Sequence, residues 1–310
     1  MFKSLSVLDN LTLNFSPGGL LFMNITLAFV MFGIALNLKP GDFKRIIQNP
    51  KSPLSGIISQ FILLPALTLL LILILNPTPA VAFGMILVAA CPGGNISNFM
   101  SSLAKVNIAL SISLTAFATI SAIVLTPLNF AFWGGLYIKS SPLLVPITID
   151  AFEMLKTILI LLGIPIIAGI IFASKFPIIT KKILKPFKIF SICAFLLFIV
   201  FAFSANFDYF IKYIPLIFII VLLHNLLALG TGYGFSSLMK LPAIDRRTIS
   251  IETGIQNSGL ALILIFNPKI FPPELHLGGM AFIAAWWGIW HLISGLLLSF
   301  YWSKKPLIYK

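Results

Sequence analysis

Long apolar stretches separated by short polar or charged segments dominate the pattern of this chain. A membrane core about 30 Å thick is crossed by roughly 20 apolar residues in an α-helix. Nine stretches approach that length once two internal interruptions are allowed. We therefore predict nine membrane-spanning helices, at residues 19–38, 53–75, 80–104, 107–135, 149–172, 188–204, 214–239, 246–266 and 275–303.

The composition leads to the same class of protein. The chain is 59% hydrophobic and 9% charged, whereas soluble domains carry about 25% charged residues. We expect an all-α polytopic membrane protein whose surroundings are the lipid bilayer. The net charge of +13 does not indicate nucleic acid, because basic residues of membrane proteins gather in cytoplasmic loops. No pattern in the chain calls for an obligatory protein partner.

The positions of the basic residues predict the orientation. With nine spans, one side of the membrane holds four of the loops and the C-terminal tail, and it carries 16 of the 21 Lys and Arg residues when Lys188 is included. This asymmetry predicts an extracytoplasmic N-terminus and a cytoplasmic C-terminus in the inner (plasma) membrane. The crowded side comprises 39–52, 105–106, 173–187, 240–247 and 304–310.

Two of the predicted spans are interrupted. Span 80–104 breaks at "CPGGNISN", and span 246–266 has an irregular centre, "SIETGIQNSGLAL". Non-helical backbone at membrane depth is tolerated only where it is buried in protein or lines a wet cavity. The two segments cross in opposite directions, five spans apart, which is typical of an inverted repeat whose discontinuous helices build a binding site near the midplane.

Glu252 is the only carboxylate well inside the predicted membrane region. Burying it there costs at least a few kcal/mol, and no Lys or Arg lies nearby in sequence within a span. A bound cation is therefore the favoured partner. Gln256 follows four residues later on the same helical face.

Further oxygen donors surround the breaks in the sequence. Ser111 and Thr115 are spaced four apart, Ser97 and Asn98 follow the first break, and Gln60 lies midway along 53–75. Hard oxygen ligands with one carboxylate favour sodium or a proton over zinc, copper or calcium. Hydrogen bonding between helices explains Ser111 and Thr115 equally well.

The segments "CPGGNISN", "IETGIQNSGLAL" and "HLISG" occur together in this chain. In this combination the chain resembles the bile acid:sodium symporter family, bacterial branch, over most of its length. The resemblance implies a first sodium site at Ser97, Asn98, Ser111, Thr115 and Glu252. It implies a second at Gln60, Glu252, Gln256 and the backbone carbonyls of Thr253 and Ile255. It implies an organic substrate near Asn95, Asn257 and His291.

The same resemblance implies a division into two moving domains. An extracytoplasmic segment, 1–18, precedes a panel helix, 19–38, and 149–204 adds further panel helices. The core domain is 53–135 together with 214–303, and 304–310 is a cytoplasmic tail. The fold is the family's ten-helix inverted repeat without its first helix. Asn95 stands where many bacterial members have threonine, and Leu292 where asparagine is common, so the substrate stays open.

These observations predict a transporter rather than an enzyme. The chain has no HExxH, no GxSxG and no pair of intramembrane aspartates. We expect sodium-coupled symport of an amphipathic organic anion, such as a bile acid or a small carboxylate like pantoate, by alternating access. A proton-coupled carrier or exchanger is the alternative, and an uncoupled anion channel or a membrane sensor is less favoured.

Overall fold

The computed structural model describes residues 5–9, 17–38, 40–94, 96–140, 150–204, 207–271 and 278–305. In this part of the chain the regular elements are helices, and there is one isolated β-bridge. They are α1 (Ser6–Asp9), α2 (Pro17–Ala35), α3 (Pro40–Gln48), α4 (Lys51–Ile58), η2 (Ser59–Leu63), α5 (Leu64–Leu75), α6 (Pro79–Ala90), α7 (Ile96–Leu103), α8 (Ile108–Ser140), α9 (Ala151–Ile158), η3 (Leu159–Gly163), α10 (Ile164–Lys175), α11 (Pro177–Ser204), α12 (Phe207–Leu238), α13 (Ala243–Gly254), α14 (Ser258–Ile265) and α15 (Gly278–Ser303).

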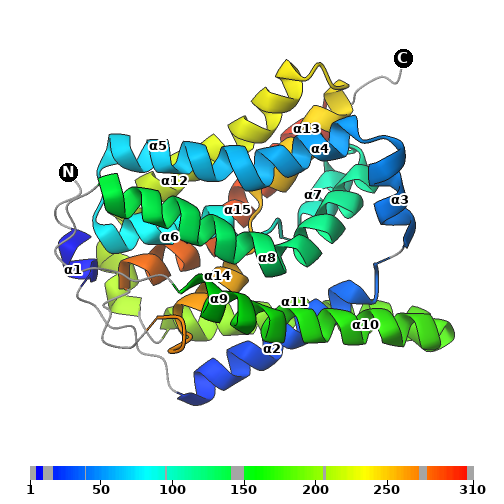
Figure 1. Cartoon of the computed structure of the whole chain (residues 1–310), viewed down its shortest axis with the longest axis horizontal. Helices are drawn as coiled ribbons and strands as arrows, with labels where there is room; N and C mark the ends of the chain where they lie inside the picture. Colours follow the sequence, from blue (N-terminus) through cyan, green and yellow to red (C-terminus); the bar gives the residue numbers. More distant parts are fainter. Residues whose placement is uncertain are drawn as a thin grey trace.

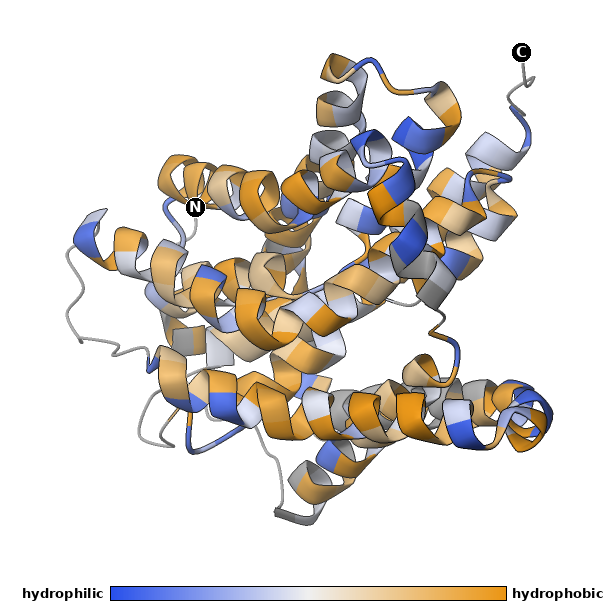
Figure 2. Ribbon diagram, turned by 45° about the vertical axis from the view of Figure 1, so that its right-hand side comes forward, coloured by the Kyte–Doolittle hydropathy of each residue, from blue (hydrophilic) through white to orange (hydrophobic). Residues whose placement is uncertain are grey.

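The prediction of an all-α membrane protein is confirmed, while the count of nine spans stays a prediction. Among the described residues, five continuous helices are long and apolar enough to cross a membrane. Figure 2 shows hydrophobic residues dominating these helices, with hydrophilic ones gathered near helix ends and connections. The five are Lys51–Leu75, Ala151–Lys175, Ile108–Ser140, Ile217–Leu238 and Gly278–Ser303.

Two predicted loops are helical. The predicted loop 39–52 contains α3, and α11 begins at Pro177 rather than near 188. Pro177 occupies the first helical position, where the missing N–H is not needed. The lysines that follow continue the helix, because the backbone hydrogen bonds of a helix form whether the side chains are polar or apolar. Hydropathy marks where the apolar surface ends, not where the helix ends.

Two of the long helices contain a π-helical turn before a proline. η2 interrupts the helix 51–75 just before Pro65, and η3 interrupts 151–175 just before Pro165. Proline removes a backbone donor and crowds the preceding turn, which a wider turn relieves. The η2 turn contains Gln60, so the irregularity also sets where this side chain points.

The two interrupted helices pair through their unwound backbones. The Gly94 amide donates to the Ile255 carbonyl over 2.7 Å, and the Asn257 amide donates to the Pro92 carbonyl over 2.8 Å. Between them, Gly93 and Gln256 form an antiparallel bridge. A Cβ on Gly93 would lie 3.0 Å from Glu252 Oε1, so glycine permits this close approach. Each break thereby satisfies part of the other's backbone.

The helices form two groups in Figure 1. The first group is α2, α9, η3, α10 and α11, in which α2 contacts α10, α11 and η3. The second group is α4–α8 with α12–α15, held by contacts such as α6 with α15 and α12 with α13. The groups meet where α9 and η3 contact α8, where α2 contacts α14 and where α11 contacts α12.

The apolar core consists of one large cluster that joins the two groups and two small clusters within the second group. One large cluster combines Met31 and Leu162 of the first group with Phe130 and Ile217 of the second. Two small clusters, one around Met100 and one around Leu114, consist of second-group residues, the connections at 104–106 and 241 included. The shared packing therefore lies in one part of the molecule.

Candidate functional site

The carboxylate of Glu252 lies in the last turn of α13, immediately before the break. The residue is 3% exposed. Its Oε2 accepts hydrogen bonds from Ser97 Oγ (2.7 Å) and Ser111 Oγ (3.0 Å), and its Oε1 accepts one from Thr115 Oγ1 (2.5 Å). No Lys, Arg or His in the described ranges is within ion-pair distance. A buried carboxylate is thus surrounded by hydroxyls and forms no ion pair with any side chain that the structure describes.

Asn98 completes this first cluster. Its Oδ1 lies 2.9 Å from Ser111 Oγ and 3.3 Å from Thr115 Oγ1. Each hydroxyl has one proton, so it donates either to Asn98 or to Glu252. The i, i+4 spacing on α8 brings the two hydroxyls to one face. The fold therefore brings together all five residues of the first predicted sodium site, from α7, α8 and α13. The oxygens are those that a hard monovalent cation prefers.

The second predicted group is also assembled at the crossing. Gln60 Nε2 donates to the Cys91 carbonyl (3.0 Å) and to Gln256 Oε1 (2.8 Å). Gln256 Nε2 donates in turn to the Thr253 carbonyl over 2.7 Å. The Ile255 carbonyl accepts from the Gly94 amide, which leaves its second lone pair for another partner. Gln60 Oε1 and Thr253 Oγ1 are buried without a hydrogen-bond partner.

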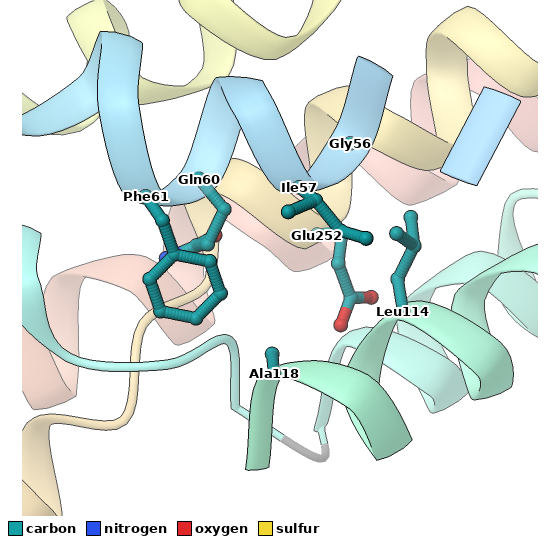
Figure 3. A pocket seen from close by; sticks show the side chains of 7 residues that line it. All are labelled: Gly56, Ile57, Gln60, Phe61, Leu114, Ala118 and Glu252. Atoms are coloured by element: carbon teal, nitrogen blue, oxygen red, sulfur yellow. The ribbon is translucent and has the colours of Figure 1, made fainter. Parts of the chain in front are cut away.

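A small cavity adjoins both clusters. It has room for about one water-sized group. Figure 3 shows the Glu252 carboxylate pointing into the space between the helix that bears Gly56 and Gln60 and the helix that bears Leu114 and Ala118. The lining residues are Gly56, Ile57, Gln60, Phe61, Leu114, Ala118 and Glu252.

Two of the three predicted substrate residues, Asn257 and His291, lie in the part of the chain that the structure describes. Asn95 lies outside the described residues. Asn257 caps α14, with its Oδ1 accepting from the Leu260 amide over 3.0 Å. His291 is buried, and its Nδ1 has no partner.

Close contacts of α15 show which of its faces meets the crossing. A Cβ on Gly288 would lie 2.8 Å from Ser258 Oγ, and one on Gly295 would lie 2.7 Å from Ile255 Cδ1. His291 is three residues after the first glycine and four before the second, so it shares their face of the helix. Two of the predicted substrate residues therefore lie at the crossing.

Asn225 of α12 is a site residue that the sequence did not identify. Its Nδ2 donates to the carbonyl of Gly254, the last residue of α13, over 2.8 Å. Its Oδ1 accepts from Ser294 Oγ of α15 over 2.6 Å. Asn225 is fully buried and fixes the end of the helix that carries Glu252. A polar dipeptide, His224–Asn225, inside an apolar span was the signal for it.

These features define a multi-pass α-helical membrane protein of the transporter class, in which two discontinuous helices cross at a buried carboxylate. Residues 24–213 match the Sodium Bile acid symporter family. The chain belongs to this family, whose members are transporters and not enzymes.

Two of the similar proteins are sodium-dependent transporters by name. The uncharacterized sodium-dependent transporter YocS of Bacillus subtilis (strain 168) is 33% identical over 287 residues, 92% of this chain and 84% of the relative. The probable chloroplastic sodium/metabolite cotransporter BASS1 of Arabidopsis thaliana is 29% identical over 77% of this chain and 58% of its own length. The P3 protein of Bos taurus is 32% identical, and the match covers 81% of this chain and 52% of the relative.

Proposed function

We propose that this protein is a sodium-coupled symporter of an amphipathic organic anion, such as a bile acid or a small carboxylate like pantoate. One observation carries the proposal: Glu252 is buried among hydroxyl and amide oxygens and forms no ion pair with a described Lys, Arg or His. A carboxylate in that position is stabilised when a cation binds. The sodium-dependent relatives favour sodium over a proton.

Two sodium ions are assigned to the two groups of oxygens. The first ion is held by Ser97, Asn98, Ser111, Thr115 and Glu252. The second is held by Gln60, Gln256, the same carboxylate and the carbonyls of Thr253 and Ile255. The partnerless Gln60 Oε1 supports this second assignment.

The charge balance at the loaded crossing favours an anion as cargo. Two sodium ions and one carboxylate leave about one net positive charge, and the N-termini of α7 and α14 add partial positive charge there. Asn95, Asn257 and His291 are the residues assigned to the cargo. Because the ions order the unwound backbone beside these residues, sodium binding and substrate binding favour each other.

Alternating access is assigned to motion between the two helix groups, the first as panel and the second as core. The small clusters nearer the Lys-rich connections contain only second-group residues, whereas the large cluster joins both groups. With the Lys-rich side in the cytoplasm, this packing supports an inward-facing state. The orientation itself, with the N-terminus outside and the C-terminus inside the plasma membrane, is part of the proposal.

Selective stabilisation by sodium tests the proposal directly. A ligand that binds only the folded state raises its melting temperature as the ligand concentration increases. We expect NaCl to raise the melting temperature of the purified protein over KCl at equal ionic strength. Taurocholate or pantoate then adds a further rise only when sodium is present. Equal behaviour in NaCl and KCl would falsify sodium coupling and favour the proton-coupled alternative, which a pH gradient tests.

A matched pair of substitutions on α8 separates ligand hydroxyls from other buried hydroxyls. Thr115 contacts Glu252, whereas Thr126 Oγ1 is buried without a partner. We expect Thr115→Val to raise the sodium concentration needed for half-maximal stabilisation roughly 10-fold, the value of one hydrogen bond to a charged group. Thr126→Val leaves that concentration unchanged. Equal effects of the two substitutions would remove Thr115 from the site.

A further inference from the structure

A second buried carboxylate, Asp245, joins the ends of three helices of the second group. Its Oδ2 accepts from Ser52 Oγ at the start of α4 (2.6 Å), and its Oδ1 accepts from Asn107 Nδ2 just before α8 (2.8 Å). Asp245 belongs to the first turn of α13 and is 8% exposed. It forms no ion pair with a described residue.

The neighbouring arginines are directed elsewhere. Arg246 Nε donates to the Leu241 carbonyl over 2.5 Å, and Arg247 Nη1 donates to the Lys305 carbonyl over 2.7 Å. Asp245 therefore forms no ion pair with a described side chain, although it lies among the Lys-rich connections of the second group.

An apolar layer separates Asp245 from Glu252. Leu110 and Leu114 of α8 pack with Ile249 of α13 in a small buried cluster, which Leu241 and Ile57 complete. On α13, Ile249 comes four residues after Asp245 and three before Glu252, so the three side chains share one face of the helix. Seven residues of helix place the two carboxylates about 10 Å apart along its axis.

The cavity beside Glu252 begins where this layer ends. Ile57 and Leu114 belong both to the apolar cluster and to the lining of the cavity, and Figure 3 shows Leu114 next to the carboxylate. A Cβ on Gly56 would lie 2.7 Å from the Leu114 methyl groups, so this glycine makes room for Leu114. Gln60, whose Oε1 is buried without a partner, belongs to the same lining, and an oxygen in need of a partner favours a cation as the occupant.

We propose that Asp245, the apolar layer and the cavity together form the route by which sodium passes between the cytosol and Glu252. Asp245 attracts cations at the mouth, Leu110, Leu114 and Ile249 form an apolar gate, and the cavity is the inner chamber. This inference rests on the proposed sodium coupling. The route runs within the second group of helices, not between the two groups. A dry apolar constriction holds back a hydrated ion, whereas a carboxylate at a mouth raises the local cation concentration in a salt-dependent way.

The gate is tested by comparing the rate at which sodium enters with the equilibrium affinity for sodium. Currents after a sodium concentration jump are recorded from oriented proteoliposomes on a solid-supported membrane, without organic anion, and stabilisation by sodium is measured on the same variants. We expect Leu114→Ala to speed the current relaxation roughly 3-fold or more, because the gate loses its bulk. The half-maximal sodium concentration changes less than about 2-fold, since Leu114 donates no ligand atom.

Asp245→Asn tests the mouth of the route. At low ionic strength we expect roughly 3-fold slower relaxation, and this difference shrinks as choline chloride is added, because screening removes electrostatic attraction. A merely structural role of Asp245 would give a defect that salt does not relieve. Leu128→Ala and Asp208→Asn, which change exposed residues of α8 and α12, serve as controls and keep wild-type rates.

The outcomes separate the two proposals. If sodium fails to stabilise even the wild-type protein selectively, the proposed function is wrong. If sodium stabilises it but Leu114→Ala and Asp245→Asn relax like their controls, the route is wrong and ions reach Glu252 from between the helix groups. Should Leu114→Ala not fold, Leu114→Val removes less volume and carries the same prediction with a smaller increase in rate.

Discussion

Replacing Glu252 by glutamine is expected to abolish the response to sodium. The substitution keeps the size of the side chain but removes the single negative charge shared by both proposed sites. The hydroxyls of Ser97, Ser111 and Thr115 surround that charge. They are neutral ligands, so they cannot replace the negative charge that holds a cation. Since a buried charge interacts strongly with a bound ion, we expect at least roughly a 100-fold rise in the half-maximal sodium concentration.

Two measurements check this expectation. The rise in melting temperature with NaCl disappears in Glu252→Gln, and sodium-driven uptake of the organic anion falls to background. Without sodium the variant melts no lower than the wild type, because a buried carboxylate without a counter-ion is costly. A sodium response that survives the substitution contradicts both site assignments.

Glu153→Gln is the matched control. Glu153 pairs with Lys156 at 3.3 Å, and the two side chains are 34% and 58% exposed. Exposed pairs contribute about 0–1 kcal/mol. The control variant should therefore keep the sodium response and nearly all of its stability.

The second large effect is expected at Gly232, where α12 crosses α13. A Cβ there would lie 2.6 Å from the Ile249 carbonyl oxygen and 2.9 Å from Ser250 Cα. Backbone atoms cannot move aside as a flexible side chain does, so Gly232→Ala pushes the two helices apart. We expect a loss of about 1–3 kcal/mol of stability, seen as a lower melting temperature.

This substitution also reaches the site. Ser250 Oγ donates to the Leu229 carbonyl over 2.8 Å, and Glu252 follows two residues later on α13. Displacing this part of α13 should weaken sodium binding several-fold as well.

Two other glycines of α12 serve as controls for Gly232. A Cβ at Gly230 or Gly234 would meet no described atom within 4 Å. Alanine at either position should be neutral or stabilising by up to about 1 kcal/mol, because it lowers the entropy of the unfolded chain. Equal melting temperatures of all three alanine variants would contradict the close contact at Gly232.

The fold brings together those candidate site residues for which chemistry alone restricted the choice. Glu252 is the one carboxylate well inside the predicted membrane region, and polar oxygens at helical spacing lie near the two breaks. Glu252, Ser111 and Thr115 were therefore accessible to reasoning from sequence. Asn225 and Asp245 were not. Their partners are distant in the chain, as for Asn107 and Asp245, which are separated by 138 residues, and local periodicity holds no information about such pairs.

Local properties of the chain were enough to establish the class of this protein. The length of its apolar stretches predicted membrane-spanning helices, because the free energy of inserting a helix depends mainly on composition. The position of the breaks and the rarity of intramembrane charge then indicated a binding site. Neither conclusion required knowing which helices are neighbours.

The construction of the site depends on three-dimensional packing. The fold pairs the two unwound backbones at Gly93 and Gln256, and it stacks Asp245, an apolar layer and Glu252 along three facing helices. It also requires glycine at Gly232, where the backbone of α13 approaches closely, and Gly56 leaves room for the Leu114 side chain. Packing and hydrogen bonding act through space, between residues whose separation along the chain does not reveal that they meet.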